Sequence, residues 1–163
     1  MPKTSGDELF ERYLHDHGYE PGPHEPSLEY HGITKRPDYL PHCGTARIAC
    51  EVEQFTPGAS ALERRLAGQR TGTASPKEVY GPIRKRVESA AKQLKPLRPL
   101  EIPLVVVLAN PEGAVIDLSV SHVLSALYGN LTYTIPIDPS VGGAVGDGQF
   151  EFGRDGKLTN DHP

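Results

Sequence analysis

One uninterrupted hydrophobic run, Leu-Val-Val-Val-Leu-Ala at residues 104–109, constrains the fold more than any other part of the chain. A run without polar alternation is typical of a strand that is buried on both faces of a sheet and covered by helices. The preceding residues supply such a helix over 82–95, because Pro82 suits a first helical position and Pro96 ends the pattern. Its apolar stripe consists of Ile83, Val87, Ala90, Ala91 and Leu94. We therefore expect an α/β fold.

Further elements are predicted on both sides of this pair. Residues 5–17 are expected to form a helix, because Ser5-Gly6-Asp7-Glu8 has the form of a capping box and Gly18 suits the end of a helix. The remaining expected elements are a strand at about 46–54, a short helix capped by Ser60 and Glu63, a helix over 120–127 closed by Gly129, a strand over 131–137 and a weak strand at 149–152. The order predicts an antiparallel meander and a further strand in a central mixed sheet flanked by helices.

The strand at 46–54 would place two carboxylates on one face. Successive residues of a strand point to opposite faces, so Glu51 and Glu53 share a face about 7 Å apart, while Ile48, Cys50 and Val52 share the other face, which can pack into a core. Asp38 precedes this strand in a turn-forming Arg-Pro-Asp run and would provide a third carboxylate. Mg²⁺ typically takes one or two carboxylates together with waters and phosphate. Charged residues on the exposed face of an edge strand would give the same spacing, so metal binding is one of two interpretations.

Length and composition set outer limits on the class of protein. The 163 residues predict a single domain, 1–163, and the 17 Gly and 16 Pro predict that it is rich in loops. Its least regular parts are a basic loop at about 64–77 and a Gly-rich region, 138–163, whose ending would suit a truncated chain. Two cysteines are too few for a disulfide framework, and no apolar run reaches the length of a membrane span or a signal peptide. We therefore expect a cytoplasmic protein without a membrane partner.

The net charge of −4 hides an uneven distribution along the chain. Residues 61–98 contain ten Lys and Arg against three Glu, whereas residues 1–60 contain five against ten acidic residues, and residues 99–163 two against eight. A basic segment of this kind is the electrostatic signature of a polyanionic partner. A solvated helix face with a charged loop would have the same composition, so this interpretation also has an alternative.

Three other groups of residues suggest chemistry less strongly. Cys43 and Cys50 with nearby histidines match no zinc-finger or zinc-ribbon spacing. The Gly-rich segment 142–148 has no Gly-Lys-Ser/Thr and is not a phosphate loop. Ser119 and His122 are neighbours in sequence, which is typical of a helix start and does not by itself make a nucleophile–base pair.

Several short motifs follow one another in a recognisable order. A helix with Glu11 comes first, followed by His24-Glu25-Pro26, Arg36-Pro37-Asp38-Tyr39-Leu40, Glu51-Val52-Glu53 and Ala91-Lys92-Gln93-Leu94. Over roughly residues 5–137 this order resembles the PD-(D/E)xK nuclease superfamily. The resemblance implies a restriction-endonuclease-like core and hydrolysis of a phosphodiester bond with Mg²⁺ or Mn²⁺.

The chain departs from the superfamily pattern at one position. The pattern places Lys two residues after the motif glutamate, and this chain has Glu53 there. Glu53 could hold metal or accept a proton from water, or a cation could come from the following helix, with Lys92 or Arg84 as candidates. Alternatively, the site has lost its chemistry and only the scaffold remains. Lys and Glu are not interchangeable beside a phosphate, because they carry opposite charges.

Two functional hypotheses follow from the resemblance. The first is a Mg²⁺-dependent nuclease that hydrolyses DNA, with RNA left open. The second is an inactive nuclease-like module that binds nucleic acid or a protein partner, and in both cases a homodimer or a place within a larger protein is left open. The expected catalytic residues are Asp38, Glu51, Glu53 and Lys92. The expected metal ligands are Asp38, Glu51, Glu53 and Glu11. The expected nucleic-acid contacts are Arg84, Lys85, Lys92 and Gln93.

Overall fold

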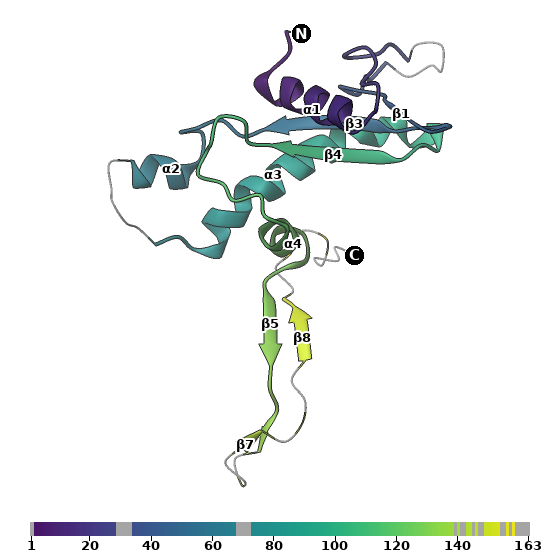
Figure 1. The fold of residues 1–163 in the computed structure, drawn as a ribbon. Helices are drawn as coiled ribbons and strands as arrows, with labels where there is room; N and C mark the ends of the chain where they lie inside the picture. Colours follow the sequence, from purple (N-terminus) through teal and green to yellow (C-terminus); the bar gives the residue numbers. More distant parts are fainter. Residues whose placement is uncertain are drawn as a thin grey trace. The chain divides into compact units, whose positions relative to one another are not determined.

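The computed structural model describes residues 2–28, 34–67, 73–138, 140, 143–144, 146, 149–153, 156 and 158. The fold is α/β, as predicted, and the chain divides into two compact units, Met1–Ile116 and Asp117–Pro163 (Figure 1). The first unit contains the basic segment and every residue that we expected to bind metal or nucleic acid. The second unit contains the C-terminal helix and the strands that follow it.

Two parallel strands form the centre of the first unit. Strand β3 (Ala49–Gln54) pairs with β4 (Leu104–Ala109) in parallel, with Ala49 opposite Leu104. Helix α3 (Pro76–Leu94) and the 3₁₀ helix η2 (Lys95–Leu100) connect them, because parallel neighbours need a long crossover. Both predicted strands are thus confirmed. Among the described residues, the expected antiparallel meander is limited to the short β1–β2 hairpin (His42–Cys43 with Ala46–Arg47) and one bridge between Tyr39 and Cys50.

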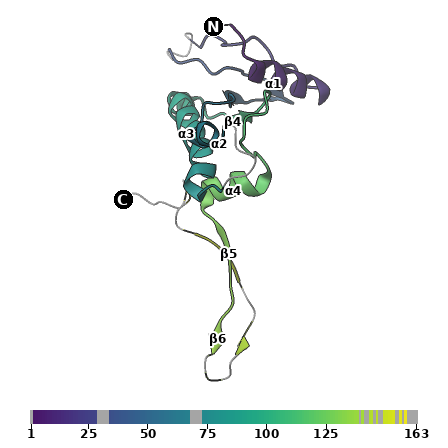
Figure 2. The ribbon, with the colours of Figure 1, turned by 90° about the vertical axis from the view of Figure 1, so that its left-hand side faces the viewer.

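Helices cover both faces of this strand pair. Helix α1 (Ser5–Asp16) packs Phe10 and Leu14 against Tyr39 and Cys50 on one side. On the other side, Leu94 at the end of α3 and Leu97 of η2 pack with Leu28 and Ala49. Figure 2 shows α1 and α3 on opposite sides of the strands. Glu51 and Glu53 share the strand face of Ala49, so the predicted carboxylate face is covered by α3 and is not open to solvent.

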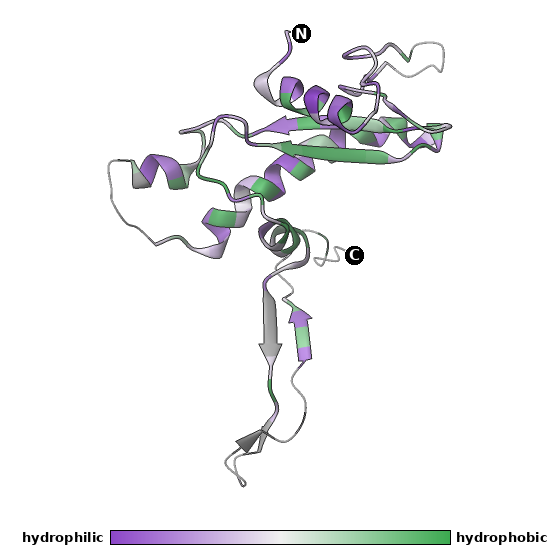
Figure 3. Cartoon of the chain, viewed as in Figure 1, coloured by the Kyte–Doolittle hydropathy of each residue, from purple (hydrophilic) through white to green (hydrophobic). Residues whose placement is uncertain are grey.

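The β4 strand is hydrophobic along its whole length (Figure 3). Its burial is nevertheless uneven, because Ala109 is 4% exposed and Val105 is 38% exposed. The prediction of burial on both faces therefore holds only in part. Within the described residues β3 is its one strand neighbour, which leaves the other edge of β4 without a covering strand.

Helix α3 begins earlier than the sequence analysis predicted. Ser75 caps it, with its hydroxyl accepting from Glu78 N and the Glu78 carboxylate accepting from Ser75 N at 2.9 Å, and Pro76 occupies the first turn. Pro82 is therefore inside the helix, and the prediction that it starts the helix is wrong. The predicted loop at 64–77 is also shorter, because α2 (Ala61–Leu66) and α3 include both of its ends. Residues 68–72 lie outside the described residues.

Two details of helix packing also differ from expectation. The cap of α1 is Thr4 with Asp7, one residue earlier than the predicted box beginning at Ser5. On α3, Ile83, Ala90 and Leu94 are buried, whereas Ala91 is exposed and Val87 is half-buried. The apolar stripe is therefore rotated slightly from the predicted one.

The second unit contains one helix and two short strand pairs. Helix α4 (Val120–Tyr128) ends at Gly129, whose φ of +95° suits glycine. Strands β5 (Leu131–Thr134) and β8 (Gln149–Phe152) pair antiparallel, as do β6 (Ile137–Asp138) and β7 (Gly143–Ala144). The predicted helix at 120–127 and the weak strand at 149–152 are confirmed. Among the described residues, no helix has the length and apolar character needed to cross a membrane.

Candidate active site

Asp38 is fixed against the strand that carries the glutamates. The Tyr39–Cys50 bridge joins the two segments through backbone hydrogen bonds of 3.1 and 2.9 Å. Val52 N then donates to Asp38 Oδ2 at 2.7 Å, so the aspartate side chain occupies the place of the next backbone acceptor along β3. Asp38 therefore lies near enough to Glu51 for its charge to raise the pKa of the Glu51 carboxyl.

Glu51 is buried in this region with an unsatisfied oxygen. The residue is 5% exposed, and its Oε2 atom has no hydrogen-bond partner among the described residues. Burial, followed by the nearby charge of Asp38, raises the pKa of Glu51 to about 7. The charge of Lys35 and a hydrogen bond from Gln93 act in the opposite direction. A buried acceptor without a partner is unfavourable unless a proton or a cation occupies it.

The pKa of Asp38 is also raised by its surroundings. Burial raises its pKa, and the charge of Asp7 on α1 adds to this effect, while the Val52 hydrogen bond and the charge of His24 oppose it. The His24 ring lies 5.2 Å from the Tyr39 ring, and its Nε2 atom is 3.6 Å from Asp7 Oδ1. The site thus concentrates negative charge in a partly desolvated place, which favours a bound cation.

A lysine does approach the carboxylates, but from an unexpected segment. Lys35 Nζ donates to Gln93 Oε1 at 2.7 Å, and its charge lowers the pKa of Glu51. Gln93 also hydrogen-bonds Glu51, so it connects this lysine to the buried carboxylate. Lys35 precedes Asp38 by three residues and was not among the predicted site residues. Its position just before the Pro-Asp turn was the only sequence signal that could have indicated it.

Glu53 is on the predicted face but is already paired. It is 6% exposed, and Arg86 Nη1 on α3 donates to its Oε2 at 3.0 Å. Arg86 also lies over the Phe55 ring, with its guanidinium carbon 5.9 Å from the ring centroid. In the described part of the chain, no three His, Cys, Asp or Glu side chains are grouped so that they could hold a metal ion. Asp38 and Glu51 therefore form a two-carboxylate site rather than a three-carboxylate one.

The other predicted site residues are distributed around the unit. Glu11 accepts from Tyr39 Oη at 3.0 Å and pairs with Lys3 on the α1 side of the strands. Lys92 is 75% exposed and pairs with Glu88 on the next turn of α3. Arg84 lies over Tyr80, with 6.0 Å between its guanidinium carbon and the ring centroid, and Lys85 is exposed. Of the predicted nucleic-acid contacts, Gln93 is thus the one linked directly to Glu51.

The serine–histidine group at the start of α4 has the geometry of a helix start. Asp117 Oδ2 and Ser119 Oγ both lie 2.9 Å from the same atom, His122 Nδ1. A nucleophile and an orienting carboxylate would need to contact different ring nitrogens. Ser119 N donates to Asp117 Oδ1 at 2.7 Å, which is a local turn immediately before α4, and the helix begins at Val120, so the predicted helix start is confirmed.

Comparison with known proteins adds no assignment. No family model matches the chain, and no curated protein and no solved structure matches it significantly. The chemistry of the site must therefore be argued from its residues. Asp38 and Glu51 fit Mg²⁺, which takes one or two carboxylates, because Glu51 offers a free oxygen and both groups are destabilised in the ionised form without a cation.

Proposed function

We propose that this protein is a Mg²⁺-dependent nuclease of the PD-(D/E)xK type that hydrolyses phosphodiester bonds in DNA. The observation that supports it most directly is the buried, unpartnered Glu51 Oε2 atom beside Asp38. Two interacting carboxylates in a partly desolvated site are expected to recruit a hard divalent cation. When bound, Mg²⁺ would polarise the phosphate and lower the pKa of water.

The arrangement of elements supports a restriction-endonuclease-like core for the same unit. Helix α1 precedes the segment with Asp38, β3 carries Glu51, and α3 leads to β4 in parallel beside β3. This is the order that the resemblance implied. The proposal differs from the sequence-based one in the source of the cationic group, which we assign to Lys35 in place of the motif lysine.

Each residue then has a specific role. Asp38 and Glu51 hold the cation, and Gln93 orients both Glu51 and Lys35 through its amide. Lys35 contributes positive charge where the phosphate gains negative charge during hydrolysis. Glu53 does not act as a base in this proposal, because its carboxylate is neutralised by Arg86.

The test is a cleavage assay with Mg²⁺ and Mn²⁺ on duplex and single-stranded DNA, combined with calorimetric titration of each metal. Asp38→Asn and Glu51→Gln should each abolish metal binding and cleavage, and Lys35→Ala should reduce cleavage about 10²-fold or more while metal still binds. Glu88→Gln is the matched control, because Glu88 is half exposed on α3 and pairs with Lys92 one turn along the same helix. Unchanged metal affinity in Asp38→Asn would remove the basis of the proposal.

A second function is favoured by one observation, the Glu53–Arg86 pair. This pair removes the third carboxylate and leaves the described site with two. Under this alternative the unit is a catalytically inactive nuclease-like module that binds nucleic acid or a protein partner. Absence of cleavage under all metals, with salt-dependent DNA binding retained, would support the alternative over the nuclease.

A further inference from the structure

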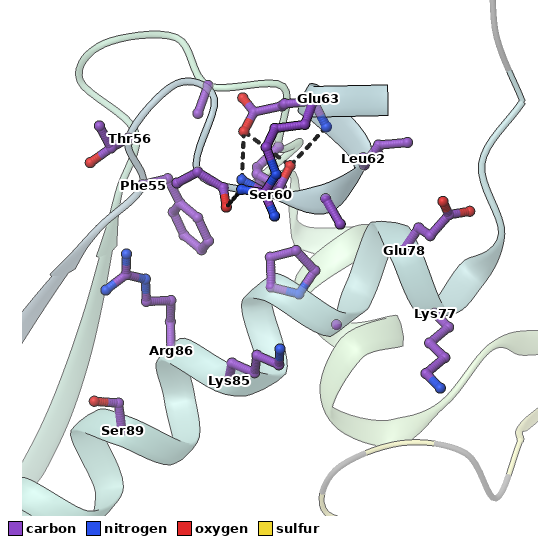
Figure 4. Close-up of a pocket in the computed structure, with 17 residues that line it drawn as sticks. Phe55, Thr56, Ser60, Leu62, Glu63, Lys77, Glu78, Lys85, Arg86 and Ser89 are labelled. Atoms are coloured by element: carbon purple, nitrogen blue, oxygen red, sulfur yellow. Dashed lines mark hydrogen bonds between the residues drawn. The ribbon is translucent and has the colours of Figure 1, made fainter. Parts of the chain in front are cut away.

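A cavity of about 590 Å³ lies beside the proposed active site, at the end of β3. Its walls come from the segment that follows β3, from the start of α2, from the first four turns of α3 and from the residues after β4 (Figure 4). It therefore lies beyond the carboxyl ends of two parallel strands, where α/β proteins commonly bind ligands. Its volume is within the range of small-molecule sites.

The cavity combines an apolar interior with positive charge. Phe55, Leu62, Pro82, Ala114 and Ile116 provide hydrophobic walls. Figure 4 shows Phe55 and Arg86 side by side, with Lys85 next to Arg86 on α3. A ligand that combines an apolar part with an anionic group would complement both the hydrophobic walls and the positive charge of this cavity.

The two acidic residues that line the cavity are not expected to repel a bound anion, because both carboxylates already accept hydrogen bonds from the protein. The Glu63 carboxylate accepts from Ser60 N at 3.1 Å and from Val115 N at 2.7 Å. The Glu78 carboxylate accepts from Ser75 and pairs with Arg65 at 3.0 Å. Their negative charges are therefore compensated by donors that are already in place.

Two lysines of the lining are free to bind a ligand. Within the described residues, neither Lys77 nor Lys85 makes a hydrogen bond or an ion pair. Lys77, Gly81 and Lys85 follow one another at four-residue intervals, so they lie on one face of α3 about 6 Å apart along its axis. A side chain at Gly81 would meet nothing within 4 Å of its Cβ. The glycine thus leaves an open notch between two unpaired ammonium groups.

We propose that this cavity binds one nucleotide unit, with its base against the apolar walls and its phosphate at the Gly81 notch between Lys77 and Lys85. The choice of a nucleotide rests on the proposed nuclease function, because Arg86 lines the cavity and pairs with Glu53, which is two residues from Glu51 along β3. In a polynucleotide the unit would belong to the strand being cut. A free mononucleotide has the same chemistry, and the two sources are separated by experiment.

The test is calorimetric titration of the full chain in EDTA with thymidine 5′-monophosphate, a thymidine tetranucleotide, thymidine and inorganic phosphate. The nucleotide should bind more tightly than thymidine or inorganic phosphate. Tighter binding of the tetranucleotide would identify a strand as the source, and equal binding a free nucleotide. Failure of the monophosphate to bind at millimolar concentration, or equal binding of inorganic phosphate, would overturn the proposal.

Substitutions at Gly81 and Lys85 locate the binding. Gly81→Leu fills the notch while replacing a helix glycine, so the melting temperature should stay equal or rise as nucleotide affinity falls at least about tenfold. Gly81→Ala should have a smaller effect. Lys85→Glu should weaken binding at least about tenfold, whereas Arg12→Glu, the same charge change on the far side of the strands, should not. Equal affinity in wild type and Gly81→Leu would place the nucleotide elsewhere.

Failure of the nucleotide-pocket proposal and failure of the nuclease proposal give different experimental results. If the monophosphate binds and Gly81→Leu blocks it, while no metal supports cleavage, the nucleotide pocket stands and the nuclease fails. If cleavage depends on Asp38 and Glu51 but Gly81→Leu binds the monophosphate normally, the nuclease stands and the pocket fails.

Discussion

Glu51 occupies a position that disfavours its ionised form. Its pKa is raised by burial to about 7, compared with an ordinary value of 4.5 that applies to the unfolded chain. Below pH 4.5 the group is protonated in both states, so its contribution to stability is fully present. Between about pH 4.5 and 7 the unfolded chain loses the proton first, and this contribution, on the order of 3 kcal/mol, is lost.

The first prediction is therefore that Glu51→Gln stabilises the metal-free protein at pH 8. Urea denaturation in EDTA should show that the free energy of unfolding of the wild type falls from pH 4.5 to pH 7. The free energy of unfolding of the mutant should fall much less over the same range. At pH 8 the mutant should be more stable by up to about 3 kcal/mol. Mg²⁺ should raise the stability of the wild type only. Parallel pH profiles for the two proteins would contradict the assignment.

A second residue-scale prediction concerns the Glu53–Arg86 pair. Glu53 is 6% exposed, so Arg86→Met would leave a buried carboxylate without its donor and should cost about 1–3 kcal/mol at pH 8. Lys92→Met is the matched change in an exposed pair on the same helix and should cost about 0.5 kcal/mol or less. Both are measured by chemical denaturation. Equal costs would mean that the buried pair is no stronger than the exposed one.

At the scale of elements, sequence patterns predicted those features that depend on residues near one another in the chain. The run at 104–109 gave the bounds of β4, and the alternation around Glu51 gave its strand and shared face with Glu53. The start of α3 was missed although Ser75-Pro76-Lys77-Glu78 is a capping box with Pro in the first turn. The burial of the glutamates and the position of Lys35 near Glu51 depend on tertiary packing, which cannot be inferred from the periodicity of the sequence. Whether residues 1–163 form one domain stays a prediction.

The third prediction tests the corrected face of α3. Ile83 is fully buried, so Ile83→Ala should destabilise by about 2–5 kcal/mol. Ala91 is exposed, so Ala91→Ser should change stability by no more than about 0.5 kcal/mol. Thermal melts at one pH compare the two. A larger cost for Ala91→Ser would restore the face that the sequence stripe predicted.

At the scale of the whole molecule, charge is divided between the two units. Residues 1–116 contain fifteen Lys and Arg and fifteen Asp and Glu, so the first unit has no net charge, and residues 117–163 account for the full −4. A neutral unit in an acidic chain has no general affinity for polyanions. Any binding of nucleic acid must therefore come from a local concentration of cations, and α3 carries the largest group of them within one element.

The last prediction is the salt dependence of that binding. Each phosphate neutralised on duplex DNA contributes about −0.9 to the slope of log affinity against log salt. Replacing Arg84 and Lys85 together by Ala should reduce the slope by up to about two units, and most of the effect should come from Lys85, since Arg84 is half-buried beside Tyr80. Arg12→Ala on α1 should leave the slope unchanged. Anisotropy of a labelled duplex across a salt series measures all three. A full slope in the double mutant would move the contact surface off α3, and no binding at low salt would make a protein the better partner, because Lys77 and Lys85 on this helix have no acidic partner among the described residues and would otherwise attract phosphate.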